Sequence, residues 1–367
     1  IVWPFVGKLG PQGKPPLQPG ERDAGERLNV VLTSQQPLTA SPAKPPSTSA
    51  PSPAGAVVPR LARPPRRAVH GVLLLDKPVG LSSNQALQIT KRLFRADKAG
   101  HTGTLDPLAS GLLPLCFGAA TKFSQLSLDA DKAYEATLKL GVITSTADGE
   151  GEVLEVRDVA VTRAQFQAAC ASLSGATLQT PPMHSALKHQ GKALYEYARA
   201  GIAVERAPRS ITLHSIELLD GAADVWRIAV RCSKGTYIRV LAEDIGKALG
   251  CGAHLLALRR TESGSLTLAN SCTLEQLAEL DEPGLDARLL RVDTLLGEVP
   301  VVRLARAEAA RFLGGVRIKT SLADAPLLRV YGPEPNAFLG GGHSVAGELI
   351  STRLLSAIEV QALLNER

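Results

Sequence analysis

The chain has 367 residues, 44% of them hydrophobic, which is enough for about two folded domains. The whole net charge of +6 lies in residues 1–70, which contain nine Lys or Arg and three Asp or Glu, so the remainder is balanced and its charge does not indicate nucleic-acid binding. Five cysteines without a CxxC pair disfavour a disulfide framework and a zinc ribbon, and no apolar run approaches the ~18 residues of a membrane span. We expect a soluble protein of the reducing cytoplasm.

Residues 1–69 form a basic tail rich in Pro, Ser and Ala, in which apolar residues do not recur with a regular period. Such a segment cannot bury enough apolar surface to offset the entropy of ordering, so we predict that it is disordered. Its apolar start lacks the long apolar run and the cleavage site of a signal peptide. A transit peptide, an RNA-contacting arm and an over-extended start site remain open, and we expect removal of residues 1–68 to leave folding and turnover nearly unchanged.

The folded part begins with an apolar run at residues 71–75, which predicts a buried strand followed by a turn at Asp76–Gly80. The run Ser82–Asn84 offers helix caps, and an apolar stripe predicts a helix from there to Arg95. Further strands are expected at 134–140, 152–156, 211–219, 225–232 and 265–268, and helices at 163–173, 193–200, 238–249 and 274–280. Because strands and helices do not alternate regularly, the sequence predicts an α+β fold.

The residue pattern changes after Pro300, where short strand-like runs and glycines replace long periodic segments. One helix is expected at 306–312, and strands are expected at 316–318, 327–330 and 348–350. A module of about 70 residues is marginally stable alone. We therefore predict a small β-rich C-terminal domain that packs on the main body.

The stretch Gly100–Gly111 has the most unusual composition, with three glycines, a His and the pair Asp106–Pro107. One interpretation is a tight loop with an Asp-Pro turn, and the other is a loop that carries a catalytic carboxylate. The chain lacks GxxxxGK[ST], and no GxGxxG follows a strand, which disfavours nucleotide hydrolysis and hydride transfer. The absence of GxSxG and HExxH disfavours the common serine hydrolases and zinc proteases.

The stretch Gly100–Gly111 is more informative when further segments of the chain are considered together with it, in chain order. They are Leu75–Pro78, Gly118–Lys122, Asp131–Tyr134, Cys232–Arg239 and Leu258–Arg260. With Gly100–Gly111 they resemble the TruB family, the bacterial tRNA pseudouridine-55 synthases. The resemblance runs from Gly71 to about Gly264, and it continues more weakly into a segment similar to a PUA domain.

This resemblance implies an isomerase that converts uridine 55 in the T-loop of tRNA to pseudouridine, breaking the N1–C1′ bond and rejoining the base through C5. It implies a catalytic domain with a mixed or antiparallel sheet at residues 70–298, an RNA-clamping insertion at about 181–211 and a PUA-like RNA-binding domain at 299–367. It also implies a monomer that acts on tRNA and needs no metal, organic cofactor, membrane or guide RNA.

The family pattern assigns catalytic roles to Asp106, Tyr134 and Arg239. A carboxylate at a breaking glycosidic bond can act as nucleophile, electrostatic stabiliser or base, and these roles stay open for Asp106. Arg239 matches the arginine that pairs with this aspartate; alone, it would be interpreted as a surface cation. Tyr134 matches the tyrosine that stacks on the flipped uracil and takes part in C5 proton removal; alone, it would be interpreted as a half-buried strand residue.

Substrate-binding positions follow from the same motifs. They are His101, Tyr237, Leu258, Lys77, Lys122 and Arg260, together with His184 and Lys188 in the insertion. Where the family usually has Tyr, this chain has His184, which offers a weaker stacking face. The residues around the end of the first helix, Lys91, Arg92, Arg95 and Lys98, are either a solvated face or contacts for RNA phosphates.

Two other functions compete with the enzyme. One is an RNA-binding or tRNA-folding chaperone that uses the same pocket with catalysis secondary, and the other is a guide-RNA-dependent relative. Retention of Asp106, Tyr134 and Arg239 favours the enzyme, because binding alone does not need a paired carboxylate. The clamp-like insertion disfavours a guide RNA.

Overall fold

The computed structural model describes residues 65–335 and 337–365, which form a large sheet, a smaller second sheet and nine α-helices. Residues 1–64, and with them almost all of the tail predicted to be disordered, lie outside this part. No helix in the described part is long and apolar enough to cross a membrane.

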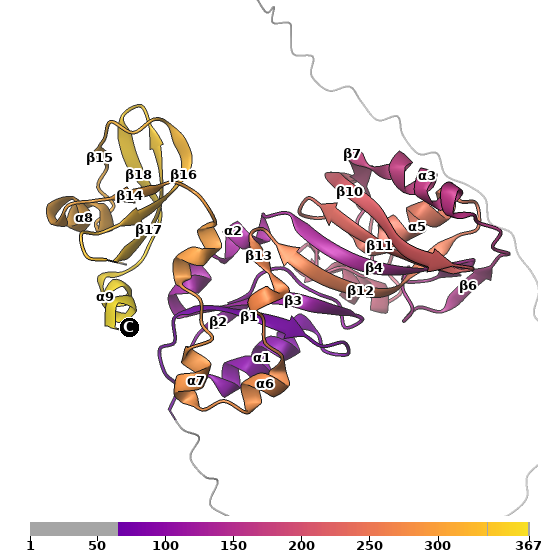
Figure 1. Ribbon diagram of the computed structural model, residues 1–367, viewed down its shortest axis with the longest axis horizontal. Coiled ribbons are helices and arrows are strands. Elements are labelled where there is room, and N and C mark those ends of the chain that lie inside the picture. Colours follow the sequence, from indigo (N-terminus) through magenta and orange to yellow (C-terminus); the bar gives the residue numbers. More distant parts are fainter. Residues whose placement is uncertain (1–64, 336, 366–367) are drawn as a thin grey trace, which may run out of the picture. The chain divides into compact units, whose positions relative to one another are not determined.

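The large sheet contains nine strands. They are β1 (Gly71–Lys77), β2 (Ala99–His101), β3 (Ala109–Phe117), β4 (Lys132–Leu140), β7 (Gly175–Gln179), β10 (Arg209–Ala222), β11 (Val225–Cys232), β12 (Ala253–Ser263) and β13 (Leu266–Thr267). Their order is β1-β3-β12-β4-β11-β10-β7, with β2 beside β3 and β13 beside β12 (Figure 1). All pairs are antiparallel except β3 with β12, which is parallel. This mixed sheet confirms the predicted α+β class.

Helices cover the sheet around two apolar cores (Figure 1). The helices of this part are α1 (Ser83–Leu93), α2 (Ser124–Leu128), α3 (Arg163–Leu173), α5 (Ile238–Ala248), α6 (Leu274–Ala278) and α7 (Glu282–Asp286), with 3-10 turns η1 (Gly118–Lys122), η2 (Leu268–Asn270) and η3 (Val292–Leu296). Phe166 of α3 stacks on Trp226 of β11 with 4.5 Å between ring centroids. Beneath α1 and α6, Phe94 contacts Phe117 at 4.9 Å. The predicted helices at 163–173, 238–249 and 274–280 are thereby confirmed with small changes at their ends.

The C-terminal part forms a second sheet of five strands, which confirms the predicted small β-rich domain. Its elements are β14 (Val301–Arg303), α8 (Arg306–Leu313), β15 (Ile318–Lys319), β16 (Ala325–Tyr331), β17 (Phe338–Val345), β18 (Glu348–Leu354) and α9 (Ala357–Asn365). Its apolar core continues into η1 and η3, where Phe338 packs on Phe123 with 5.3 Å between ring centroids. The predicted boundary between residues 298 and 299 stays a prediction.

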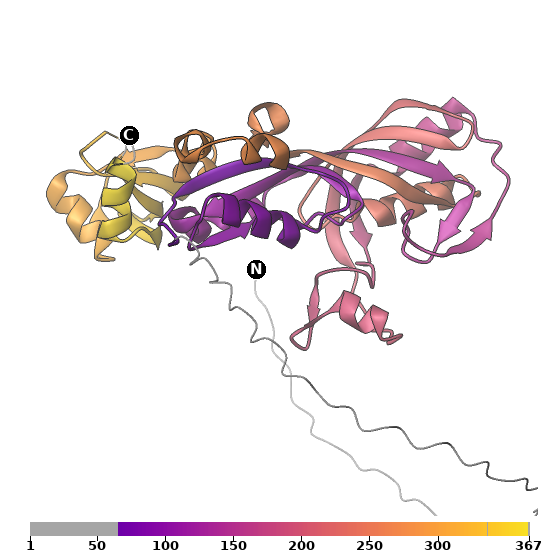
Figure 2. The same cartoon turned by 90° about the horizontal axis from the view of Figure 1, so that it is seen from below.

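Two hairpins lie outside the large sheet. One consists of β5 (Val142–Thr144) and β6 (Val153–Val156). The other consists of β8 (Lys188–His189) and β9 (Lys192–Ala193), and α4 (Leu194–Arg199) follows it directly. This second hairpin and α4 fall inside the predicted insertion at 181–211, and Figure 2 shows them projecting away from the sheet.

Three long strands were not predicted, for separate reasons. In β3, the glycines and Pro114 suggested an interrupted segment, yet Pro114 lies in register opposite Leu74. In β12, residue types of low strand propensity and two register shifts disrupt the alternation on which strand prediction depends. In β17, glycine disfavours strand prediction because it is rare in strands. Gly340 is nevertheless required there, because a Cβ would lie 2.1 Å from the carbonyl oxygen of Arg353.

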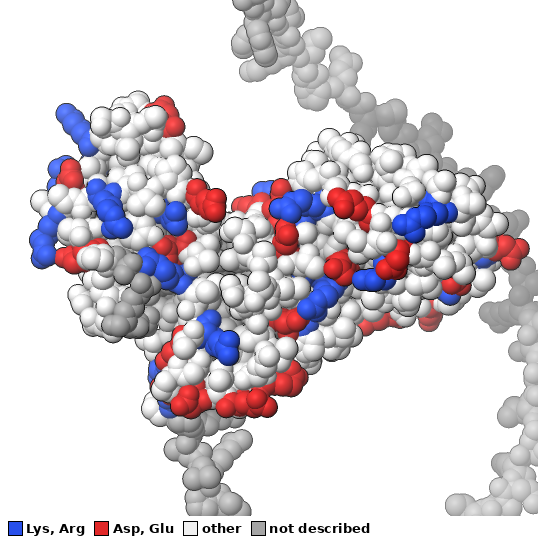
Figure 3. Space-filling model, in the orientation of Figure 1, with Lys and Arg blue, Asp and Glu red and all other residues white. Residues whose placement is uncertain are grey.

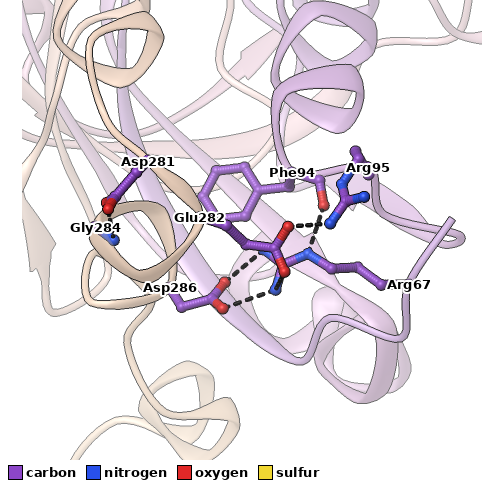
Figure 4. A network of polar contacts seen from close by, with 7 residues as sticks. All are labelled: Arg67, Phe94, Arg95, Asp281, Glu282, Gly284 and Asp286. Carbon is purple, nitrogen blue, oxygen red and sulfur yellow. Dashed lines mark hydrogen bonds and ion pairs between the residues drawn. The ribbon is translucent and has the colours of Figure 1, made fainter. Parts of the chain in front are cut away.

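A polar network ties the start of the described chain to α1 and α7 (Figure 4). The guanidinium of Arg67 donates to both carboxylate oxygens of Asp286, at 2.7 and 2.6 Å, and its Nε donates to the carbonyl of Phe94 at 3.0 Å. Arg95 pairs with Glu282. Figure 3 shows acidic side chains gathered over α6 and α7, so Arg95, predicted as a possible phosphate contact, faces compensating negative charge. Arg67 and the buried Val69 are therefore part of the folded domain and not of the predicted tail, which should end before Arg67.

This network predicts that the position of an N-terminal truncation matters. A chain that starts at residue 69 loses the Arg67 contacts, whereas one that starts at residue 65 keeps them. We expect the shorter chain to lose about 1 kcal/mol of unfolding free energy relative to the longer one, because an exposed but bidentate pair contributes at the upper end of surface ion pairs. Urea denaturation of both chains, with Arg67→Ala in the longer one as control, measures this. Equal midpoints would show that Arg67 is dispensable.

Candidate active site

Four of the six motifs meet at a pocket of about 380 Å³, and Leu75–Pro78 and Gly118–Lys122 do not line it. Its walls come from the loop that precedes β3, from β4 and β12, from the β11–α5 connection and from residues 185–187 of the predicted insertion. Six of the eleven predicted site residues line it: Asp106, Tyr134, Tyr237, Arg239, Leu258 and Arg260. The sheet order explains this convergence, because β12 lies between β3 and β4 and so brings residues distant in sequence to one place.

Asp106 lies on a loop that is held by side-chain and backbone contacts from several elements. The contacts are Ser127 Oγ to Thr102 Oγ1 at 3.0 Å, Arg260 Nη2 to Gly103 O at 3.1 Å and Gly80 N to Pro107 O at 2.8 Å. A turn follows Asp106 itself, because the amide of Ala109 donates to its carbonyl at 3.0 Å. The stretch is therefore a tight turn that presents a carboxylate to the pocket, and the catalytic role of that carboxylate stays a prediction.

The carboxylate of Asp106 pairs with Arg239, the second residue of α5, at 3.0 Å between Oδ2 and Nη2. The Arg239 side chain is only 7% exposed, while that of Asp106 is 47% exposed. The guanidinium therefore lies behind the carboxylate, which keeps a free face toward the pocket. Arg239 also donates to the carbonyls of His184 at 2.7 Å and Thr146 at 3.2 Å, so its position is fixed independently of Asp106.

Sequence reasoning missed a second carboxylate on the same guanidinium. Asp148 Oδ2 lies 3.5 Å from Arg239 Nη1, and Asp148 is buried. Its Oδ1 accepts from Thr146 Oγ1 at 2.5 Å and from the amide of Glu150 at 3.1 Å. The only signal in the sequence was an Asp in a Gly-containing turn, which is common in exposed loops. Burial, which the sequence does not display, distinguishes Asp148 from such residues.

Tyr134 and Arg260 also line the pocket, and they lie directly across from each other in the β4–β12 register. Arg260 is 1% exposed, and its Nε donates to the carbonyl of Leu112 at 2.7 Å. Gly111 permits the close approach of β3 to β12 at this point: its φ is +97°, and a Cβ would lie 2.3 Å from the carbonyl oxygen of Arg260. Burial raises the pKa of the Tyr134 hydroxyl, so the pocket holds a neutral phenol near pH 7.

Two buried lysines support the loops around the pocket. Lys77 donates to the carbonyls of Pro78 at 2.7 Å and Leu81 at 2.6 Å, and Lys132 donates to that of Leu128 at 2.8 Å. Burial lowers the pKa of each to about 8, and for Lys77 the nearby Asp106 charge acts in the opposite direction. Lys77, predicted to bind substrate, is thus committed to backbone carbonyls, and that role stays a prediction.

The remaining predicted residues lie away from the pocket. Lys122 pairs with Glu359 of α9 at 2.6 Å, and Lys188 is exposed on β8. His184 lines a neighbouring cavity of about 520 Å³, and only its carbonyl reaches Arg239. His101 lies on β2, where burial lowers its pKa and where its buried Nδ1 has no hydrogen-bond partner among the described residues. Substrate contacts by these four side chains stay predictions.

No group of three or more His, Cys, Asp or Glu side chains in the described part of the chain could hold a metal ion. All five cysteines are buried and unbridged.

Comparisons with known proteins identify the family. The matching models are described as TruB family pseudouridylate synthase (N terminal domain) for residues 91–238, tRNA pseudouridylate synthase B C-terminal domain for 239–297, and Pseudouridine synthase II TruB, C-terminal, for 300–355. A protein of Ralstonia pickettii (strain 12J) named tRNA pseudouridine synthase B is 60% identical over 265 residues, which are 71% of this chain and 83% of that protein. The chain belongs to the TruB family of pseudouridine synthases. A relative of the same name from Burkholderia mallei (strain ATCC 23344) is 60% identical over 260 residues, with the same coverage.

Solved structures share the fold at lower identity. The archaeal box H/ACA sRNP Nop10-Cbf5 complex contains a chain with a TM-score of 0.59 and 23% identity, and the match covers 79% of the TruB-family chain described here and 86% of that chain. A chain of a Cbf5-Nop10-Gar1 complex has a TM-score of 0.60 and 24% identity. That match covers 78% of the TruB-family chain and 84% of the chain in the complex. These similarities support the α+β fold, and the family membership confirms the resemblance recognised from the motifs.

The two carboxylates on Arg239 generate a stability prediction. Asp148→Asn removes a buried charge that compensates a buried guanidinium, and we expect it to lower the unfolding free energy by about 2 to 4 kcal/mol. The matched control is Asp220→Asn, because Asp220 pairs with Arg227 at 2.8 Å but both side chains are well exposed. That variant should lose less than about 1 kcal/mol. Urea denaturation of the two variants measures how much unfolding free energy each one loses. Equal losses would mean that Asp148 does not stabilise Arg239.

Proposed function

We propose that the protein is a tRNA pseudouridine-55 synthase, which isomerises one uridine in the T-loop of tRNA. The observation that carries this proposal is the half-exposed carboxylate of Asp106, which faces the pocket while the buried Arg239 compensates its charge. The pocket volume of about 380 Å³ falls in the range of small-ligand sites. The names of the 60% identical relatives supply the substrate class, tRNA.

The chemistry requires that the uridine leave its stack, because its reacting atoms are otherwise covered. Asp106 then acts at the sugar, either by attack on C1′ or by proton removal next to it, and the N1–C1′ bond breaks. The freed uracil turns and joins C1′ through C5, so N1 gains a proton and C5 loses one. Reactant and product have the same atoms, and therefore no cofactor is consumed.

Tyr134 suits the role of a stacking partner for the flipped base. Its ring lines the pocket, and stacking on an aromatic side chain contributes about 1 to 3 kcal/mol per base. Because its pKa is raised, the hydroxyl is protonated near pH 7 and can donate a hydrogen bond. Proton removal from C5 by this residue would need the hydroxyl to pass its own proton on. Leu258 and Tyr237 complete the wall around the base.

The insertion offers cations and aromatic rings for RNA. Lys192 lies over the ring of Tyr197 at 5.0 Å, and His189 contacts the same ring edge-on at 5.8 Å. Lys188 is exposed beside them. Cations that reach phosphates and rings that stack on bases are the two components of single-strand recognition. We assign the insertion to binding of the tRNA arm and the C-terminal domain to further RNA contact, without a guide RNA.

Asp106→Asn tests the proposal most sharply. Asn keeps the size of Asp and much of its hydrogen bonding, yet it can neither attack C1′ nor accept a proton as a carboxylate does. The variant should fold and bind tRNA but form no detectable pseudouridine. Because Arg239 loses part of its compensation, activities must be compared at matched folded fraction.

The control for this experiment is Asp129→Asn. Asp129 is an exposed carboxylate paired with Lys234 at 2.9 Å, outside the pocket, and its loss should leave turnover unchanged. If folded Asp106→Asn converts uridine faster than about one-hundredth of the wild-type rate, the carboxylate contributes less than ~3 kcal/mol. The noncatalytic RNA-folding alternative would then be the better description.

A further inference from the structure

One hydroxyl of α1 reaches into the loop that carries Asp106. Ser83 Oγ donates to the carbonyl oxygen of Leu105 at 3.0 Å and accepts from the amide of the same residue at 2.7 Å. Both residues are buried, Ser83 at 1% and Leu105 at 3% exposure. A single side chain therefore satisfies both backbone polar groups of the residue next to Asp106.

Ser83 is free for this contact because its neighbour caps the helix. Ser82 is the N-cap: its hydroxyl accepts from the amide of Gln85 at 3.2 Å, and its own amide donates to the Gln85 side chain at 2.8 Å. The capping box is thus complete without Ser83. The run Ser82–Asn84, interpreted from sequence as helix caps, divides between two tasks.

The distance between the Asp106 carboxylate and the Arg239 guanidinium depends on how each of the two residues is held in place. Arg239 is held by the carbonyls of His184 and Thr146, which do not belong to the Asp106 loop. The backbone of Leu105 is held by Ser83, on a helix anchored in the core by the buried Ala86 and Leu87. If Leu105 moved, Asp106 would move with it, whereas Arg239 would stay in place.

We infer that Ser83 is a positioning residue for the reaction, which acts by holding the backbone of Leu105 so that Asp106 faces both Arg239 and the bound nucleoside. This inference rests on the proposed function, because it gives Ser83 its importance through the carboxylate of Asp106. Loss of both hydrogen bonds leaves the buried amide and carbonyl of Leu105 without their partner, which favours a displaced loop. Displacements of about 1 Å at a reacting group typically cost on the order of 100-fold in rate.

The experiment compares three variants of the full chain. Ser83→Ala removes the hydroxyl, and Ser83→Cys replaces it with a weaker donor and acceptor of similar shape. Thr90→Val is the matched control on the same helix, because Thr90 is also fully buried but, among the residues that the structure describes, its hydroxyl bonds to the carbonyl of Ala86 alone, at 2.9 Å. Two quantities are measured: hydrogen exchange of the Leu105 amide, and the single-turnover rate with saturating, unmodified tRNA transcript at matched folded fraction.

We expect Ser83→Ala to accelerate exchange at Leu105 more than in β1 and β3, which a merely global destabilisation would not do. Its single-turnover rate should fall by about 10- to 100-fold while tRNA affinity changes by less than about threefold. Ser83→Cys should fall between Ser83→Ala and the wild type, and Thr90→Val should keep the wild-type rate.

Two results would overturn the inference: unchanged exchange at Leu105, or a wild-type rate in Ser83→Ala. If Ser83→Ala does not fold, a wild-type rate in Ser83→Cys has the same meaning. Asp106→Asn, measured in the same series, separates this inference from the proposed function. If Asp106→Asn is active, the proposed function itself is wrong, and with it the role of Ser83. If Asp106→Asn is inactive while Ser83→Ala is fully active, only the role of Ser83 is wrong.

Discussion

The buried guanidinium of Arg239 is the constraint on which the rest of the site depends. A cation that is 7% exposed is costly unless its donors are satisfied and its charge is compensated. Its partners come from the Asp106 loop, the turn at Thr146–Asp148 and the carbonyl of His184 in the predicted insertion. Segments that are more than 50 residues from Arg239 in sequence must therefore be in place before the charge is compensated.

Buried cations recur around this pair. Lys77, Lys132 and Arg260 are each less than 10% exposed, and all donate to backbone carbonyls of neighbouring loops. They serve the fold by satisfying carbonyls that water cannot reach. Lys132 and Arg260 line the pocket, so they also place positive charge there, which favours the approach of a polyanion. This local charge operates although the folded part of the chain is neutral overall, so the overall pI says little about substrate.

Much of the fold was predictable, because periodic apolar stripes mark α3, α5 and β11 at nearly their observed bounds. The motifs also predicted that Asp106, Tyr134 and Arg239 belong to one site, and all three line one pocket. What could not be predicted depends on neighbours distant in sequence. The bulges of β12 follow from its pairing with β4, the burial of Asp148 follows from Arg239, and Lys122 turns toward Glu359 because the C-terminal domain lies beside η1. In each case the residue type was visible, but its partner was not.

The most direct test of this account is to map pseudouridine at nucleotide resolution after the purified protein has acted on an unmodified tRNA transcript. The proposed function predicts stoichiometric conversion of uridine 55 in the T-loop, without a guide RNA in the reaction, and of no other uridine in the transcript. Intact tRNA without pseudouridine, or pseudouridine confined to other positions, would contradict the account.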